Sequence, residues 1–168
     1  LLDDFEPGMK AADVKVIFEG LRPKQVELIK AIAAKPQVED VFLHQSFDET
    51  RQWSFGEEVI TSFGYDWKRG RQDKAAHPFT TGFGINDVRI TTRVDPNFLN
   101  TMLFSSIHEC GHALYDQGMA QELDRTGLEK GASLAVHESQ SRLWENLVGR
   151  SLPFWEHFYP RLKKVFPQ

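Results

Sequence analysis

The segment from His108 to His112 reads His-Glu-Cys-Gly-His, with two histidines four residues apart and a glutamate directly after the first. On an α-helix this spacing puts both imidazoles on one face, one turn apart. Two neutral imidazoles placed in this way can bind one Zn²⁺ at about 2.0–2.1 Å. A carboxylate beside the ion can take a proton from water that the metal activates. The pattern therefore predicts a metal centre at His108 and His112, with Glu109 as its general base.

A catalytic zinc site needs a third protein ligand and leaves one position open. The downstream candidates are His137, Glu138, Glu145 and His157. His137 and Glu138 are neighbours on the next expected helix, where successive side chains point about 100° apart. Only one of the two can then face the metal, and spacing alone does not choose between them.

The elements that must position these residues follow from hydrophobic periodicity and capping signals. We expect the helix with the histidines to run from about Pro96 to Gln117, with Asp95 as its N-cap and Gly118 as its stop. A second helix, from about 133 to 148, would carry the third ligand. Two runs rich in β-branched and aromatic residues, 78–84 and 88–94, predict a small β-hairpin just before the first of these helices.

The rest of the chain is expected to be helical or irregular. Apolar stripes predict helices over 9–19 and from Pro23 to about residue 35, which would form a hairpin broken at Gly20. A further helix is expected from Glu49 to Ser62, with Asp48 as N-cap and Gly64 as its stop. Residues 65–77 are expected to form a loop, and residues 153–165 a last short helix.

The composition excludes several classes of protein. The chain has 24 acidic and 20 basic residues, a net charge of −4 and no long basic run, which argues against nucleic acid as a partner. No stretch approaches 18 apolar residues, so no membrane-spanning segment is expected. The single cysteine cannot form an intramolecular disulfide, and no signal-peptide pattern opens the chain. We therefore expect a cytoplasmic globular protein.

Four motifs in this order resemble those of the M32 metallocarboxypeptidases, the carboxypeptidase Taq type. They are His77-Pro78-Phe79 (HPF), Asp87-Val88-Arg89-Ile90-Thr91 (DxRxT), His108-Glu109-Cys110-Gly111-His112 (HExxH) and His137-Glu138-Ser139-Gln140-Ser141. The intervals between the motifs are also similar to those of the family. Four ordered motifs are much more specific than HExxH alone.

The resemblance implies a mainly α, zincin-like fold with a small β-hairpin next to the HExxH helix. It makes His108, His112 and Glu138 the ligands of one divalent metal, most often Zn²⁺ and sometimes Co²⁺, and it makes Glu109 the general base. It implies a peptide substrate, from which C-terminal residues are removed one at a time. The full-length proteins of the family are typically homodimers.

The hairpin residues His77, Asp87 and Arg89 have two interpretations. Asp87 and Arg89 could form an ordinary surface ion pair, which contributes at most about 1 kcal/mol, and His77 could simply hydrogen-bond within a loop. Alternatively, the hairpin borders the active site and receives the peptide along its edge, by β-augmentation. The resemblance favours the second interpretation, so we treat these three residues as substrate-binding candidates.

The family also has an IRYP and a GxxQDxHW segment, which do not occur before Gln168. We therefore expect residues 1–168 to be one segment, the metal-bearing middle part of a larger catalytic domain. Three alternatives stay open: a folded metal-binding fragment without activity, a metallo-endopeptidase, and a metallo-hydrolase that acts on something other than peptides.

Overall fold

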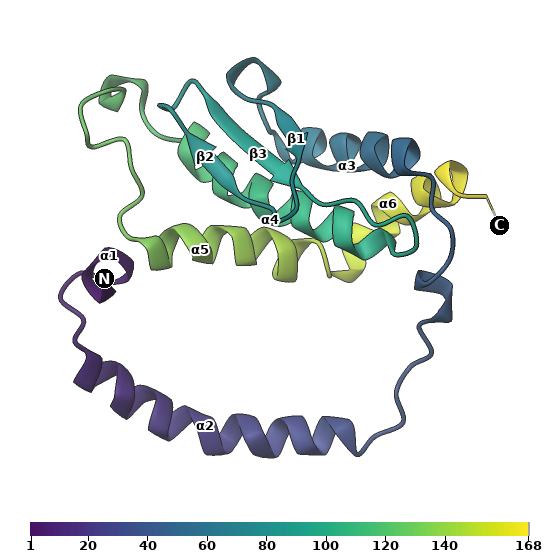
Figure 1. Ribbon diagram of the computed structural model, residues 1–168, viewed down its shortest axis with the longest axis horizontal. Helices are drawn as coiled ribbons and strands as arrows, with labels where there is room; N and C mark the ends of the chain where they lie inside the picture. Colours follow the sequence, from purple (N-terminus) through teal and green to yellow (C-terminus); the bar gives the residue numbers. More distant parts are fainter. Residues whose placement is uncertain (168) are drawn as a thin grey trace.

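The computed structural model describes residues 1–167, which form a helical protein with a small sheet along one helix (Figure 1). The elements are α1 (Leu2–Phe5), α2 (Ala11–Ala33), α3 (Glu49–Phe63), β1 (Gln72–Lys74), β2 (Thr80–Gly82), β3 (Val88–Thr92), α4 (Leu99–Gln117), α5 (Leu134–Arg142), the π-helix η4 (Leu143–Val148) and α6 (Leu152–Val165). Short 3₁₀ turns lie at Val41–Leu43, Trp67–Arg69 and Gln121–Leu123. The expected mainly α fold, with strands beside the HExxH helix, is confirmed.

The sheet contains the predicted hairpin and one strand that was not predicted. β2 and β3 pair antiparallel, with Thr81 opposite Arg89, whereas β1 pairs parallel with β3 to give the order β1-β3-β2. β1 was expected to be loop because its sequence, Gln-Asp-Lys, lacks the β-branched and aromatic residues that favour strands. The fully buried side chains of Val88 and Ile90 belong to the core that β3 forms with α4.

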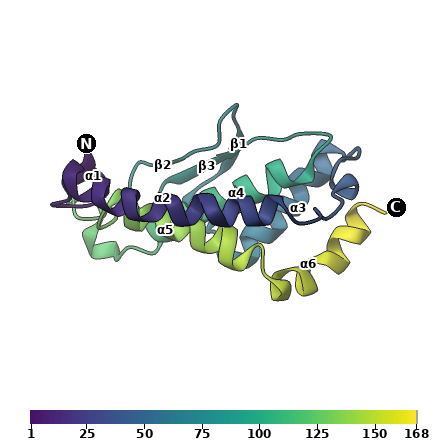
Figure 2. The same ribbon diagram turned by 90° about the horizontal axis from the view of Figure 1, so that it is seen from below.

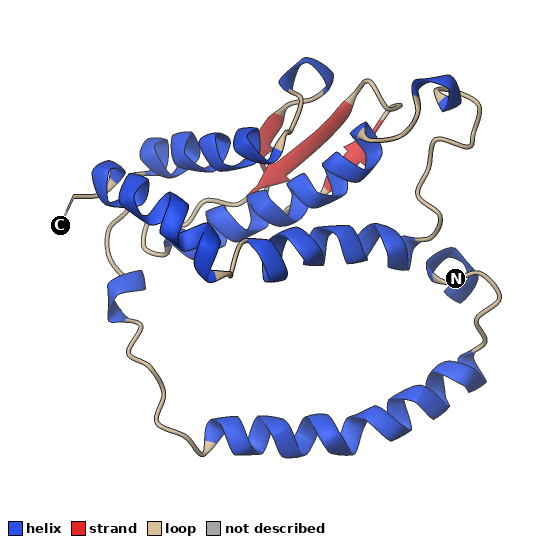
Figure 3. Ribbon diagram, turned by 180° about the vertical axis from the view of Figure 1, so that it is seen from behind, coloured by secondary structure: helices blue, strands red, loops and turns tan. Residues whose placement is uncertain are grey.

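Helix α4 lies at the centre of the packed part, with the sheet on one side and α5 on the other (Figures 1 and 3). It begins at Leu99, three residues later than expected. The Asp95 carboxylate accepts a hydrogen bond from the Asn97 backbone N–H at 2.8 Å, which closes a turn before the helix instead of capping it. The predicted end before Gly118 is confirmed.

The helix expected over 133–148 changes its geometry halfway. Ser133 caps α5 by accepting from the Val136 N–H, and at Leu143 the backbone widens into the π-helix η4. Such π-helical turns are rare in proteins, and those that occur are often found at functional sites. After a short turn, α6 continues beyond the end of α5 and buries Phe154 and Phe158 against α3 and α4 (Figure 1).

The predicted hairpin of two N-terminal helices is wrong. Residues 11–33 form one continuous helix, α2, which passes through Gly20 and Pro23 without a break. Proline removes one helical hydrogen bond, but its fixed φ is compatible with a helix, so the other turns of α2 persist around it. No residue of α2 is buried. Figure 1 shows this helix apart from the packed elements, and Figure 2 shows that it runs along the length of the molecule.

Helix α3 forms as predicted. Asp48 accepts from the Arg51 N–H at its start, and Gly64 ends it in the left-handed conformation, with φ of 103°. Among residues 1–167, no helix combines the length and the apolar character needed to cross a membrane.

Candidate metal centre

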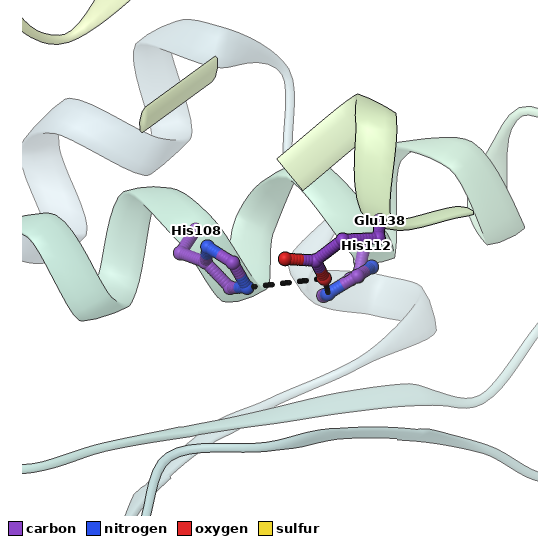
Figure 4. A group of neighbouring side chains, drawn as sticks. All are labelled: His108, His112 and Glu138. Atoms are coloured by element: carbon purple, nitrogen blue, oxygen red, sulfur yellow. Dashed lines mark ion pairs between the residues drawn. The ribbon is translucent and has the colours of Figure 1, made fainter. Parts of the chain in front are cut away.

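Three side chains from two helices converge on one point (Figure 4). His108 and His112 project from α4 and Glu138 from α5. Glu138 Oε2 lies 3.3 Å from His112 Nε2 and 3.7 Å from His108 Nε2, and the three donor atoms lie within 4.8 Å of one another. Four ligands around a tetrahedral Zn²⁺ have donor–donor distances of roughly 3.3–3.5 Å. Two imidazole nitrogens and a carboxylate oxygen at this spacing therefore fit a divalent metal.

The close approach of α4 to α5 depends on Gly111. A Cβ atom at this position would lie 2.6 Å from the Ser141 Cα atom and 2.9 Å from the Gln140 carbonyl oxygen. Both neighbours are backbone atoms, which cannot move aside as a flexible side chain can. Gly111 thus lets α5 lie against α4, and this contact brings Glu138 to the two histidines.

Each histidine also has a partner on its other ring nitrogen. His108 Nδ1 lies 2.9 Å from Glu145 Oε2, and Glu145 is in turn held by Arg150 at 3.0 Å. His112 Nδ1 lies 2.6 Å from His137 Nδ1. With both Nδ1 atoms engaged, the two Nε2 atoms are the ones that face Glu138. A ring nitrogen fixed in this way is the usual arrangement around a metal-binding histidine.

The other ligand candidates from the sequence therefore have different places. Glu145 and His137 contact the Nδ1 atoms of His108 and His112, not the Nε2 atoms that face Glu138. His157 is exposed on α6, where its ring contacts Phe158. Asp116, one turn after His112, lies 2.8 Å from His137 Nε2. The sequence offered no signal for this pairing beyond the helical spacing of Asp116 from His112.

The electrostatic surroundings favour the metal-binding forms of these groups. Burial, followed by the nearby charges of His137 and His108, lowers the pKa of His112 to about 4, so its imidazole is neutral at physiological pH. Burial raises the pKa of Glu138, but the hydrogen bond from Arg142 and the nearby imidazoles outweigh this, and the net shift is downward. Glu138 is therefore a carboxylate.

Glu109 points from α4 toward the sheet and is 6% exposed. The Thr80 hydroxyl, on β2, lies 2.7 Å from its Oε2 atom. Within residues 1–167 the other carboxylate oxygen has no hydrogen-bond partner. Burial raises the pKa of Glu109, and the Thr80 hydrogen bond and the His108 charge offset this only in part. Glu109 is therefore a stronger base than an exposed glutamate.

The three substrate-binding candidates lie around the sheet. Arg89 on β3 donates two hydrogen bonds of 2.7 Å to Asp87, and its guanidinium lies 5.1 Å from the centre of the Phe83 ring. Both members of the pair are partly exposed. His77 is exposed in the connection between β1 and β2, and its electrostatic effect on the pKa of Glu109 is the smallest of those that act on this carboxyl group. The structure therefore places His77 near the site, and it shows Asp87 and Arg89 paired with each other.

A cluster of side chains that fits a divalent metal lies beside a candidate general base in a helical fold. This combination is that of a zincin-type metallopeptidase. Comparison with known proteins identifies the family. Residues 1–168 match the family described as carboxypeptidase Taq (M32) metallopeptidase. The chain therefore belongs to the M32 family of metallopeptidases, which confirms the resemblance seen in the sequence.

Among curated proteins, the chain is 46% identical over 167 residues to thermostable carboxypeptidase 1 of Thermus thermophilus and 38% identical over 168 residues to carboxypeptidase 1 of Bacillus subtilis. Each alignment covers 99% of this chain but only 33% or 34% of the relative. The crystal structure of an M32 carboxypeptidase from Deinococcus radiodurans R1 superposes with a TM-score of 0.92 at 48% identity, covering 98% of this chain and 33% of that chain. The chain thus spans about a third of the length of the relatives that it matches.

Proposed function

We propose that this chain carries the metal-binding part of a metallocarboxypeptidase that hydrolyses the C-terminal peptide bond of its substrate. The observation that carries this proposal is the convergence of His108, His112 and Glu138, with Glu109 directly beside them on the same helix. Two nitrogen donors and one oxygen donor suit a borderline ion, so Zn²⁺ is the expected metal and Co²⁺ the expected substitute.

The residues of the chain would divide the chemistry in the following way. A divalent ion held by His108, His112 and Glu138 would act as a Lewis acid: it would polarise the scissile carbonyl group and lower the pKa of the attacking water. Glu109 would take the proton from the attacking water on its free carboxylate oxygen and pass it to the leaving amine. Thr80 would keep the other oxygen of Glu109 fixed, so that the base has one orientation.

The peptide would lie along the free edge of β2, by β-augmentation. The sheet order leaves β2 unpaired on one side. A groove of about 700 Å³ borders this edge and is also lined by residues 129–133, just before α5, and by Asp3, Asp4 and Pro7 of the N-terminal segment. Thr80 lines the groove together with His137, so an extended chain in it would pass next to the metal ligands. His77, Asp87 and Arg89 do not line this groove, and their contact with the substrate is proposed from the sequence resemblance alone.

Replacing the general base tests the catalytic part of the proposal. We expect Glu109→Gln to bind about one Zn²⁺ per chain and to lose at least about 100-fold in turnover of a blocked dipeptide, because the amide cannot accept the proton. Glu19→Gln on the exposed helix α2 is the matched control and should change neither property. Turnover by Glu109→Gln at the parental rate would show that Glu109 is not the base.

A second substrate separates exopeptidase from endopeptidase activity. We expect cleavage when the substrate ends in a free carboxylate and little cleavage when the same substrate is amidated. Equal cleavage of both would favour a metallo-endopeptidase.

A folded metal-binding fragment without activity is the second candidate function. The observation that favours it is the coverage of only about a third of the relatives. It predicts stoichiometric Zn²⁺ binding and no turnover of either substrate.

A further inference from the structure

His112 is connected to a carboxylate through a second histidine. Its Nδ1 atom lies 2.6 Å from His137 Nδ1, and His137 Nε2 lies 2.8 Å from Asp116 Oδ1. A carboxylate only accepts hydrogen bonds, so the hydrogen between His137 and Asp116 belongs to His137 Nε2. In neutral His137 the Nδ1 atom is then an acceptor, and the hydrogen between the two imidazoles belongs to His112 Nδ1.

We infer that Asp116 and His137 are positioning residues that hold His112 in the tautomer with its hydrogen on Nδ1. The lone pair of His112 is then on Nε2, the atom that faces Glu138 Oε2 at 3.3 Å. Two acceptor atoms at this distance have no hydrogen between them, an arrangement that a cation would stabilise. The inference rests on the proposed metal site and adds two residues that determine its affinity.

The packing around His137 restricts its movement. Its ring lies nearly coplanar with that of His112, with centroids 4.6 Å apart and planes 23° apart, as an in-plane hydrogen bond requires, and the Tyr115 ring meets it edge-on at 5.4 Å. The Tyr115 hydroxyl accepts from the Ala132 N–H, in the segment that leads into α5. His137 is therefore fixed both by its hydrogen bonds to His112 and Asp116 and by its contact with the Tyr115 ring.

His108, the other proposed ligand on α4, contacts a carboxylate directly. His108 Nδ1 meets the Glu145 carboxylate without an intervening ring. Asp116 belongs to α4 and His137 to α5, so the relay to His112 also crosses between the two helices that supply the ligands. Any change that separates these helices would therefore alter the tautomer of His112 as well as the distance to Glu138.

The test measures the Zn²⁺ dissociation constant of this chain by competition with a chromophoric chelator. We expect His137→Phe, which keeps a ring but cannot accept a hydrogen bond, to weaken binding by about 10–100-fold. His137→Asn should recover part of the loss, because its Oδ1 atom can take the place of the ring Nδ1. Asp116→Ala should also weaken binding.

His44→Phe is the matched control. His44 also pairs with an aspartate, Asp40 at 3.2 Å, and stacks on a ring, that of Phe98, but it contacts none of the proposed ligands. Its replacement should leave the affinity unchanged. Parental affinity in His137→Phe would overturn the inference.

An independent readout uses the metal-free parent chain and does not depend on how the variants fold. Imidazole ¹⁵N spectra should show the hydrogen of His112 on Nδ1, and a hydrogen on Nε2 would overturn the inference. The proposed metal site is tested separately by His112→Ala and Glu138→Ala. If these two bind Zn²⁺ like the parent, the site itself is wrong; if they lose binding while His137→Phe keeps it, only the relay is wrong.

Discussion

The N-terminal helix α2 and the packed region from Phe47 onward contrast in how their apolar residues are used. All the buried hydrophobic residues lie in the packed region, whereas α2 has none. In α2, Val16, Ile17 and Phe18 are 69%, 53% and 62% exposed. Both regions satisfy the local requirements of a helix, but only the packed region has partners for its apolar faces. Helix formation and burial are therefore separate conditions, and the candidate site is found where both are met.

The packed region also explains how the site residues are held. Cys110 and Ala113 of α4 are fully buried with Val88 and Ile90 of β3, which fixes the sheet on the side of Glu109. Ile107, on the same helix, belongs to the cluster that includes Phe154 and Phe158 of α6. The residues between and around the proposed metal ligands are thus core residues, and the geometry of the site depends on packing on both sides of α4.

The largest expected difference between the two regions is in the effect of truncating an isoleucine. Ile107→Ala removes a side chain that is 0% exposed and should reduce the free energy of unfolding by about 2–5 kcal/mol. Ile29→Ala, at a position that is 64% exposed, should change it by less than about 0.5 kcal/mol. Urea denaturation of the two variants measures both values. Equal effects would mean that α2 is packed in solution.

A pair of glycine substitutions should have effects of opposite sign. Gly111→Ala puts a methyl group against the backbone of α5 and should destabilise the chain by about 1–3 kcal/mol. It should also weaken Zn²⁺ binding, because α5 must move away with Glu138. Gly20→Ala meets nothing within 4 Å and should stabilise α2 by about 0.5–1 kcal/mol. Far-ultraviolet circular dichroism and chelator competition report the two results, and a Gly111→Ala chain with parental Zn²⁺ affinity would contradict the close-approach argument.

A smaller effect is expected at alkaline pH from Tyr65. Its buried hydroxyl shares its one hydrogen between the carbonyl oxygens of Val88 and Arg71, at 2.8 and 3.1 Å, and burial raises its pKa well above the ordinary value near 10. The folded state therefore favours the neutral phenol. The stability that this contributes is complete below pH 10 and is lost as the pH rises through the folded-state pKa.

The tyrosine prediction is measured by unfolding experiments across this pH range. Tyr65→Phe should lose about 1–2 kcal/mol at neutral pH, because the two carbonyl groups lose their shared donor, and should show a shallower decline above pH 10. Tyr159→Phe, at a position that is 51% exposed, is the control and should match the parent. An equally steep alkaline decline in Tyr65→Phe would contradict the prediction.

Much of the local structure was predictable because it depends on neighbours in the sequence. The caps of α3 at Asp48 and Gly64, the hairpin of β2 and β3 and the shared face of His108 and His112 follow from turn chemistry and helical spacing. The continuity of α2 through Pro23 was missed because an interior proline removes a hydrogen bond and usually kinks or breaks a helix, whereas α2 continues through it.

The parts that could not be predicted depend on contacts between distant segments. β1 forms because β3 offers a free edge to a polar strand, and nothing in Gln72–Lys74 favours a strand on its own. Helical spacing predicted that only one of His137 and Glu138 could face the metal, but not which one, because the choice depends on how α5 rotates against α4. The roles of Asp116 and Glu145 depend on the same packing and on the widened helix at η4.

The coordination of a bound metal tests the central claim most directly. A crystal structure of this chain loaded with one equivalent of Zn²⁺ should show the ion bonded to His108 Nε2, His112 Nε2 and a carboxylate oxygen of Glu138, with Glu109 beside it and unbonded. Zinc bound through His137 or Glu145, or a folded chain that binds no zinc at this site, would contradict the account.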